Sequence, residues 1–442
     1  MKKIIILLPI VFGVAIAAFS MSLLQADAMV AAPQEGPDSA QVIIQYAPGD
    51  IFVKPISFTA SISGVVALEF TGLDVVTKDY SWGIAVCSIG GVGCPADNCF
   101  CGGSTFWNYS YWDGTSWQAY TVGPTDTEIN DGAIEGWRWG EWSDDSIPPP
   151  AVAQALDWLL DQQFTDGGYG DDSGSVETTL SIGAVGLDAA NWRKQPGYNS
   201  LMDYLLANGG DYSRKGAAEA GKLASGLVSS NGCSPYFTYQ PMDYYDPGTG
   251  KFNPESGFHI WGMLGTTSLS ETVPVQSVSY LKSTIQSDGG WEWNSGFGSD
   301  SNTTALAVQA LTAGGDTQAT TEVISGMNFL KNSQNTDGGF YYTDVWGATD
   351  SDTNSTAYAV QAILAAGEDP TSGRWVISET NPISYLLNMQ LPDGSFEYIP
   401  GFGSNLSATQ QAIPALMHKF NPLKVNSLPA CPVLFLPSVY RQ

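Results

Sequence analysis

The chain has 442 residues, which is enough for two or three domains of ordinary size. Hydrophobic residues make up 43% of it, so it can bury a core, and wholesale disorder is not expected. With 17 Lys and Arg against 44 Asp and Glu, the formal charge of −27 argues against partners such as nucleic acid or an anionic membrane surface.

The N-terminus has the pattern of an export signal. Lys2 and Lys3 precede an uncharged apolar run over residues 4–24, and a small-residue cleavage site follows at Ala26 and Ala28. We therefore exclude residues 1–32 from the fold and expect a secreted or cell-surface protein. The run is long enough to cross a bilayer, so a retained N-terminal membrane anchor is the alternative.

Six cysteines fit an oxidising compartment. Four of them crowd into one loop: Cys87, Cys94, Cys99 and Cys101. A zinc site is the alternative there, but paired C-x2-C spacing and a nearby His are both missing from the loop. The spacing favours disulfides of unassigned pairing, while Cys233 and Cys431 pair with each other or stay free.

Residues 40–145 predict a small α+β domain. "QVIIQYAP" alternates as a strand does, "FWNYSYWDGTSWQAYTVG" predicts two aromatic strands around an Asp-Gly turn, and "SGVVALEFTGLDV" predicts a helix. The three prolines that end the segment 146–150 favour an extended linker, and Pro150 also suits the first position of a helix.

From residue 151 to residue 420 the chain repeats. The marker is a Gln, then Asp-Gly-Gly or Asp-Gly-Ser, then an aromatic residue. Its four copies end at Tyr169, Trp291, Phe340 and Phe396. A helix precedes each marker and an Ala-rich helix follows it, and the long first interval has room for two degenerate copies. Six such pairs can close into a ring with the small-residue helices inside, and residues 421–442 remain as an apolar tail.

The marker resembles the repeat of the squalene cyclase and prenyltransferase superfamily, which implies an all-α (α/α)6 toroid of the terpenoid cyclase type. The stretches "WNYSYWDGTSWQAYTVG" and "INDGAIEGWRW" resemble the small β-grasp-like domain of the intrinsic factor and transcobalamin proteins. That domain comes first here, as in bacterial secreted proteins that carry both modules.

Class II terpene cyclases carry Asp-x-Asp-Asp-Thr-Ala, in which the middle Asp is the proton donor. The resemblance aligns this motif with residues 352–357, where Asn354 replaces the acid, and with residues 300–305, where Asn302 does. An amide cannot deliver a proton to carbon, whereas Asn is a strong N-cap. Both stretches are therefore interpreted as capped structural helices, with no catalytic residue assigned.

Metal sites are weaker alternatives. Asp350, Asp352 and Asn354 copy the first ligands of a calcium loop, but Ser355 and Gln361 stand where its Gly and Glu belong. The zinc of protein prenyltransferases needs Asp, Cys and His, and the toroid offers only Cys233, His259 and His418. His259 suits a satisfied helix position and His418 a helix C-terminus. No metal is predicted.

The sequence thus predicts a secreted, non-catalytic protein that binds a small molecule between toroid and small domain. The resemblance implies a cobalamin or related corrinoid as ligand, and a cell-surface transporter or receptor as partner. The candidate ligand contacts are aromatic, although the same residues could pack between repeats: Tyr169, Trp291, Trp293, Phe340, Tyr341, Tyr342 and Phe396. The alternatives are a terpene cyclase-like isomerase and a surface adhesion or structural module.

Overall fold

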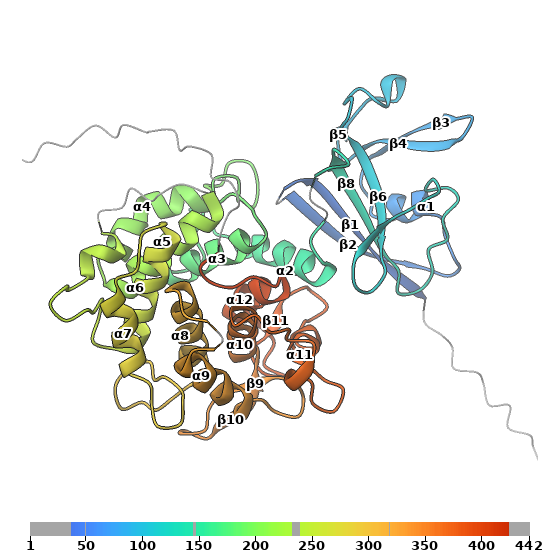
Figure 1. Ribbon diagram of the computed structural model, residues 1–442. Coiled ribbons are helices and arrows are strands. Elements are labelled where there is room, and N and C mark those ends of the chain that lie inside the picture. The colour runs from blue at the N-terminus through green and yellow to red at the C-terminus, as the bar shows by residue number, and fades with distance from the viewer. Residues whose placement is uncertain (1–36, 49, 145–146, 232–238, 318, 424–442) are drawn as a thin grey trace, which may run out of the picture. The chain divides into compact units, whose positions relative to one another are not determined.

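The computed structural model describes residues 37–48, 50–144, 147–231, 239–317 and 319–423. A β-rich region runs from β1 to β8, and a helical region runs from α2 to α12 (Figure 1). The predicted export signal or anchor lies outside the described residues, as do Cys233 and Cys431. No described helix has the length and hydropathy that crossing a membrane requires.

A five-stranded mixed sheet forms the centre of the β-rich region. In sheet order its strands are β2 (Asp50–Phe58), β1 (Asp38–Ala47), β8 (Ile134–Gly140), β6 (Phe106–Trp112) and β7 (Trp117–Ala119). The central strands β1 and β8 are parallel, and the other neighbours are antiparallel. Ile44 of β1 and Trp137 of β8 are buried with Leu68 of α1 (Gly64–Glu69). The strands and the helix predicted from these sequences are confirmed.

A smaller antiparallel sheet carries the cysteines. It consists of β3 (Val75–Tyr80), β4 (Gly83–Ile89) and β5 (Val92–Gly93), and the short 3-10 helix η1 (Ala96–Asn98) follows it. Disulfides join Cys87 to Cys99 and Cys94 to Cys101. The predicted disulfides are confirmed. The zinc alternative is wrong because each of the four sulfurs is bonded to another sulfur in one of these two disulfides.

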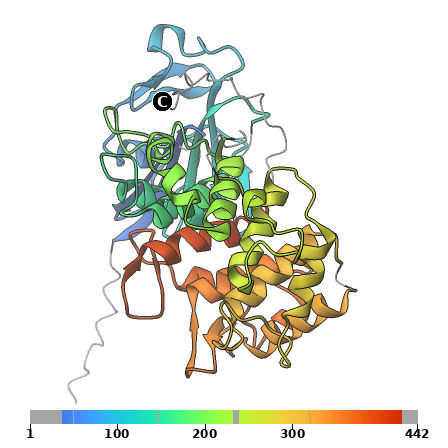
Figure 2. The same ribbon diagram turned by 90° about the vertical axis from the view of Figure 1, so that its left-hand side faces the viewer.

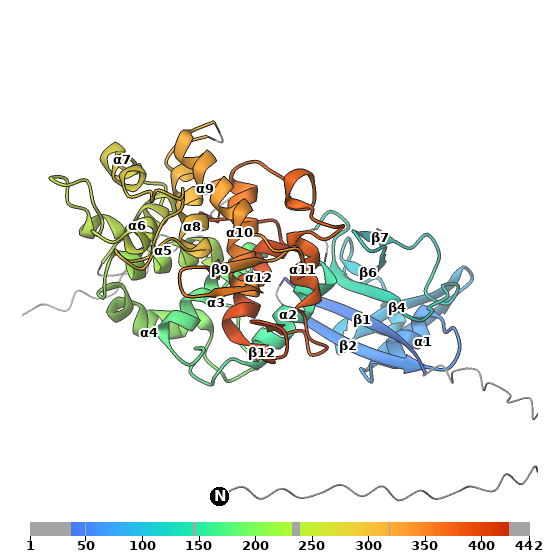
Figure 3. The same ribbon diagram turned by 90° about the horizontal axis from the view of Figure 1, so that it is seen from below.

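In the helical region, six described helices follow one another around a closed circuit. They are α3 (Asp172–Ala184), α5 (Ala217–Asn231), α6 (Ser256–Ser268), α8 (Ser301–Ala313), α10 (Thr353–Ala365) and α12 (Leu406–Leu416). Each packs on the next, and α12 packs back on α3. Figures 2 and 3 show the red helix α12 beside the green helices that begin the region. We call these six the inner helices.

The other elements of the helical region connect the inner helices. The helices are α2 (Pro150–Asp161), α4 (Leu201–Ser213), η2 (Pro241–Tyr244), α7 (Val275–Ser283), α9 (Thr321–Asn332), η3 (Gly373–Trp375) and α11 (Pro382–Asn388). The strands are β9 (Phe340–Thr343), β10 (Ala348–Asp352), β11 (Phe396–Glu397) and β12 (Ser404–Asn405). As expected, α2 begins at Pro150, where a missing N–H leaves no helical hydrogen bond unmade.

Small residues let the inner helices pack closely. A Cβ atom on Gly221 of α5 would lie within van der Waals overlap of the Trp261 carbonyl of α6, and one on Gly265 of α6 would overlap Gly221 in turn. Only glycine fits at these two positions because each meets backbone rather than a movable side chain. The predicted small-residue packing of the inner helices is confirmed here.

The repeated marker is a tight turn that connects two helices. Asp337 Oδ1 accepts a hydrogen bond from the N–H of Gly339 at 2.9 Å, and Gly338 has a φ of +89°, which favours glycine. The N–H of Phe340 then donates to Thr356 Oγ1, in the first turn of α10, at 2.9 Å. The same bond, also at 2.9 Å, joins Tyr169 to Ser175, Trp291 to Thr304 and Phe396 to Thr409. The marker therefore fixes where each of these inner helices starts.

Candidate functional site

The marker aromatics are core residues. Tyr169, Trp291, Phe340 and Phe396 are at most 3% exposed. The Trp291 Nε1–H donates to the Leu281 carbonyl at 2.9 Å, and the Trp192 Nε1–H donates to the Tyr169 hydroxyl at 2.6 Å. Of the other candidates, Trp293, Tyr341 and Tyr342 are half-buried. A ligand contact by any of these seven residues stays a prediction.

The acidic loops end in helix caps, but the capping residue differs from the predicted one. Asp300 Oδ1 accepts from the N–H of Thr303 at 2.7 Å, and Asp352 Oδ1 accepts from the N–H of Ser355 at 2.8 Å. Burial raises the pKa of both carboxyls to about 6. The expectation that an Asn caps each helix is wrong. Each Asp stands directly before its helix, where its side chain reaches the free N–H groups.

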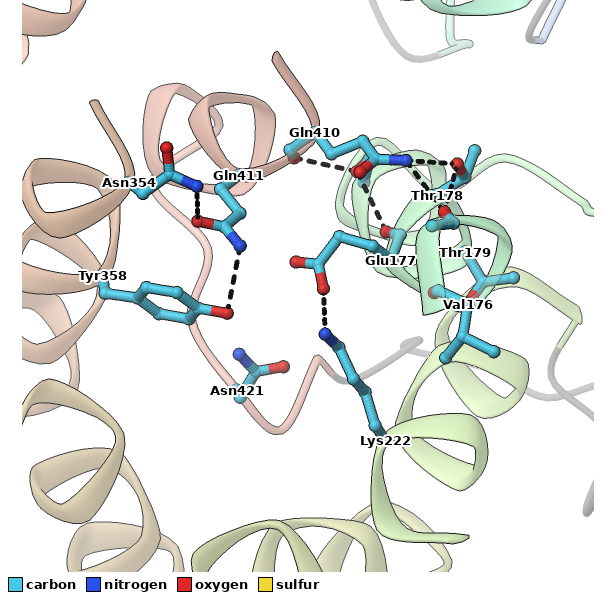
Figure 4. Close-up of polar contacts among 12 residues, drawn as sticks. Val176, Glu177, Thr178, Thr179, Lys222, Asn354, Tyr358, Gln410, Gln411 and Asn421 are labelled. Atoms are coloured by element: carbon cyan, nitrogen blue, oxygen red, sulfur yellow. Dashed lines mark hydrogen bonds and ion pairs between the residues drawn. The ribbon is translucent and has the colours of Figure 1, made fainter. Parts of the chain in front are cut away.

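Asn302 and Asn354 are instead the second residues of α8 and α10. The side-chain amide of Asn354 donates to Gln411 Oε1 of α12 at 2.6 Å. Figure 4 shows Asn354 pointing toward the same region as Gln411 and Tyr358. The residue that replaces the cyclase acid therefore belongs to the polar interior of the circuit of helices.

The sixth residues of the six inner helices form a set that faces this interior, which we call the central ring. Its members are Glu177, Lys222, Trp261, Leu306, Tyr358 and Gln411. In the four inner helices that follow a marker, this residue lies two positions after the Ser or Thr that the marker bonds, so Glu177, Leu306, Tyr358 and Gln411 occupy equivalent positions. Figure 4 shows Glu177, Lys222, Tyr358 and Gln411 pointing toward one another from four different helices.

An ion pair lies within the central ring. The Lys222 ammonium contacts the Glu177 carboxylate, and their side chains are only 16% and 9% exposed. Lys222 Nζ also lies 5.4 Å from the centroid of the Trp261 ring, within the range of a cation–π interaction. Two opposite charges and an aromatic face therefore come from three successive inner helices.

Tyr358 completes the polar side of the central ring. It is buried, and its pKa is raised well above the ordinary value by that burial, with smaller contributions from the charges of Glu177 and Tyr212. Gln411 Nε2 donates to the Tyr358 hydroxyl at 3.4 Å. The hydroxyl is therefore neutral at physiological pH and can donate or accept a hydrogen bond.

The segment that follows α12 crosses the carboxyl ends of the inner helices. The N–H of Asn421 donates to Gln309 Oε1 at 2.8 Å, and its side-chain amide donates to Gln361 Oε1 at 3.1 Å. Gln309 and Gln361 are the ninth residues of α8 and α10, one turn below the central ring. A cavity of about 490 Å³ lies beside this segment and is lined by Thr267, Thr312 and residues 418–423, among others.

Neither described histidine is a strong metal-site candidate. His259 is fully buried, its Nδ1 accepts from the N–H of Phe252 at 3.1 Å, and its Nε2 lies 3.0 Å from the Ser277 carbonyl. Burial lowers the pKa of His259 to about 4. These contacts confirm the satisfied helix position. Within the described ranges, no cluster of three His, Cys, Asp or Glu side chains suits a metal ion.

Sequence reasoning missed Glu177 and Lys222. Glu177 lies in "SVETTLSIGA", the helix after the marker that ends at Tyr169, and Lys222 lies in "AAEAGKLASG", a copy too degenerate to show the marker. The signal that could have found them is a charged residue amid small and apolar ones, six residues into an inner helix. Such a residue must face either solvent or a shared polar interior.

Residues 254–405, which are 152 of the 442 residues, match a family model described as the squalene-hopene cyclase C-terminal domain. No curated protein sequence is significantly similar to the chain. Among solved structures, the apo type II terpene cyclase MstE from Scytonema aligns with a TM-score of 0.42 and 13% identity, over 60% of this chain and 96% of that one.

Two other solved structures align more weakly. A protein from Actinoplanes gives a TM-score of 0.39 and 17% identity, over 61% of this chain and 98% of its own. The ent-copalyl diphosphate synthase from Streptomyces platensis gives 0.33 and 13%, over 65% and 52%. The similarity to the cyclase fold rests on the family match over residues 254–405.

These findings correct the predicted function. We expected a non-catalytic cobalamin-binding protein because Asn354 replaces the cyclase acid. The family match points to cyclase-type function instead. The structure removes the objection as well, since a buried carboxyl, Glu177, faces the interior from a different repeat. The helical region of this chain therefore has the cyclase-type toroid fold.

Proposed function

We propose that the toroid is a terpene cyclase-like isomerase in which Glu177 and Lys222 transfer a proton to and from a polyene at the central ring. The observation that carries this proposal is the Glu177–Lys222 ion pair, buried among inner helices. A general acid needs a titratable group in position, and this pair supplies one that Asn354 cannot.

The pair can exist as two charged groups or, after one proton shift, as a neutral carboxylic acid beside a neutral amine. An apolar ligand at the central ring would exclude water, and a low dielectric penalises the charged form. The ligand therefore favours the form in which Glu177 is a proton donor. Substrate binding would itself convert Glu177 to the protonated form that can donate.

The reaction balances without a co-reactant. Glu177 gives its proton to an alkene carbon, and the resulting cation either loses a neighbouring proton or is first attacked by a second double bond, which forms one C–C bond. The neutral Lys222 amine accepts the released proton, which restores the ion pair. Since both transfers use adjacent groups, the chemistry suits a double-bond shift or a single ring closure. The faces of Trp261 and Tyr358 suit the intermediate cation.

Finer features of the fold belong to the same proposal. We infer six helix pairs, because at least one outer helix precedes each inner helix, and in the third pair that helix is the 3-10 helix η2. The parallel central strands and the single helix of the β-rich region support a β-grasp-like small domain. Export is supported by the disulfides, which are typical of oxidising compartments.

The test is proton exchange in D2O. The purified protein is incubated with farnesol, geranylgeraniol and squalene, and the recovered lipids are examined by mass spectrometry and NMR. We expect a product or recovered substrate that carries deuterium at one carbon. Glu177→Gln keeps the side-chain volume and should abolish the incorporation, while circular dichroism confirms that it is folded. Equal incorporation by the Gln variant, or none by the wild-type protein, contradicts the proposal.

A further inference from the structure

The interior of the toroid has unpartnered hydrogen-bond acceptors. The Oδ1 atoms of Asn302, Asn354 and Asn421 are buried and have no hydrogen-bond partner. The amide nitrogen of Asn354 is committed to Gln411, and that of Asn421 is committed to Gln361. In both bonds the Asn nitrogen is the donor, so in each amide the oxygen is left without a partner.

The three oxygens belong to the same interior as the central ring. Asn302 and Asn354 occupy equivalent second positions of the adjacent helices α8 and α10. Asn354 contacts a central-ring residue directly, and Figure 4 shows Asn421 pointing inward below Tyr358. Acceptors therefore lie on both sides of the ring along the helix direction.

Most of the unpartnered polar atoms of the toroid are pure hydrogen-bond acceptors, and the exception is the Ser277 hydroxyl, which can also donate. Among the described residues of the toroid, every buried side-chain atom without a partner is an oxygen: Glu219 Oε2, Ser277 Oγ, Asn302 Oδ1, Asp316 Oδ2, Asn354 Oδ1, Gln410 Oε1 and Asn421 Oδ1. Buried polar groups are nearly always paired, so each of these oxygens is a position where water or a ligand donor can bind. A carbonyl oxygen can be paired only by a donor.

We propose that the central ring recognises ligands through their hydrogen-bond donors, and that its substrate is an isoprenoid alcohol rather than a hydrocarbon or a diphosphate. This inference rests on the proposed function. A ligand hydroxyl group offers an O–H donor to the unpartnered side-chain oxygens of Asn354 and Asn421. A diphosphate offers only acceptors and negative charge, and the cation of the central ring, Lys222, is already paired with Glu177.

The charge of the chain supports the same selection. With 44 acidic and 17 basic residues, the chain repels polyanions in general. Tyr358 adds a neutral hydroxyl to the interior, which can donate to a ligand hydroxyl and pass on the hydrogen-bond network through Gln411. An alcohol head group can therefore be paired as both donor and acceptor.

The test measures binding of three ligands that differ only at the head group: farnesol, farnesyl methyl ether and farnesyl diphosphate. We expect farnesol to bind at least about tenfold more tightly than the methyl ether, because sites built around a substrate O–H reject analogues that lack it. Farnesyl diphosphate should not compete. Equal affinity for alcohol and ether, tighter binding of the diphosphate, or no binding of farnesol overturns the inference.

Three variants test whether the acceptor oxygens cause the preference for the alcohol. Asn302→Leu and Asn354→Leu should each weaken farnesol binding and leave ether binding unchanged, whereas Asn354→Asp, which keeps an acceptor, should retain the preference. The proposal on ligand preference and the proposal on the reaction can be refuted independently. Tighter binding of the alcohol without deuterium incorporation refutes the isomerase proposal but supports the alcohol preference. Equal turnover of ether and alcohol supports the isomerase proposal but refutes the alcohol preference.

Discussion

The Lys222 ammonium contacts the Glu177 carboxylate, and each is the sixth residue of its inner helix. The two helices, α5 and α3, are neighbours in the closed circuit. A charge pair in such a position is costly to break, because removing one member leaves the other buried and uncompensated. Four predictions follow from this pair and from the hydrogen bonds around it.

The ion pair should show strong coupling in stability. We expect Lys222→Met to lower the free energy of unfolding by about 3 kcal/mol, because Glu177 then loses its only salt-bridge partner among the described residues, in a poorly solvated site. Adding Glu177→Gln should restore most of that loss. Urea unfolding of the two single variants and the double variant measures the coupling energy, and additive effects would show that the two groups do not interact.

Restoring a carboxyl at position 354 should raise activity. Asn354→Asp places an acid at the position where the resembling cyclase motif has its proton donor, beside the central ring. We expect deuterium incorporation to become at least about tenfold faster, since a positioned general acid typically contributes that much or more. Asn302→Asp is the matched change in the neighbouring helix. An unchanged rate of deuterium incorporation in both variants would show that a carboxyl at position 354 takes no part in proton transfer.

Stability should fall as pH rises through the titration of the buried helix caps. Burial raises the pKa of Asp300 and Asp352 to about 6. The folded protein therefore binds these protons more tightly than the unfolded chain, whose Asp pKa is about 3.9. The resulting stabilisation is full below about pH 4 and is lost by about pH 6.

Asp352→Asn keeps a capping oxygen and removes the titration. We expect this variant to show a smaller fall in Tm between about pH 4 and pH 6, and to gain about 1–2 kcal/mol at pH 7. Asp369→Asn is the control, because hydrogen bonds from Thr371 lower the pKa of that exposed carboxyl. Parallel pH profiles for wild-type protein and Asp352→Asn would refute this prediction.

The hydroxyl group of Thr356 should be needed for stability, whereas the methyl group of Thr356 should not. It accepts the N–H of Phe340 at 2.9 Å, in a buried site. Thr356→Val leaves that N–H unpaired and should cost about 1–3 kcal/mol, whereas Thr356→Ser keeps the acceptor. Thermal unfolding compares the two, and an equal loss in both variants would assign the effect to packing instead.

The repeats, the disulfide-linked loop and the strands of the β-rich region could be predicted because each has a local pattern. The N-cap could not be assigned reliably. Asp352 and Asn354 are both good capping residues, so only the backbone shows which one precedes the helix. The same two-residue difference decides that Asn354 faces the interior.

The central ring could not be predicted because its members share a position and not a residue type. Glu177, Lys222 and Tyr358 come together only through the closure of the circuit, and no sequence motif links them. Which of the aromatic candidates are buried could not be predicted for a related reason. Phe340 and Trp291 follow conspicuous turns, but their backbone N–H bonds to Thr356 and Thr304 direct the rings into the core.

Scaffold and specificity are separate in this fold. The hydroxyl at the start of an inner helix recurs as Ser175, Thr304, Thr356 and Thr409, while the six members of the central ring are all different residues. Duplicated units have thus kept the bonds that build them and diversified at one position. If the proposed function holds, single substitutions at the central ring would change ligand preference without disturbing the bonds that build the helices.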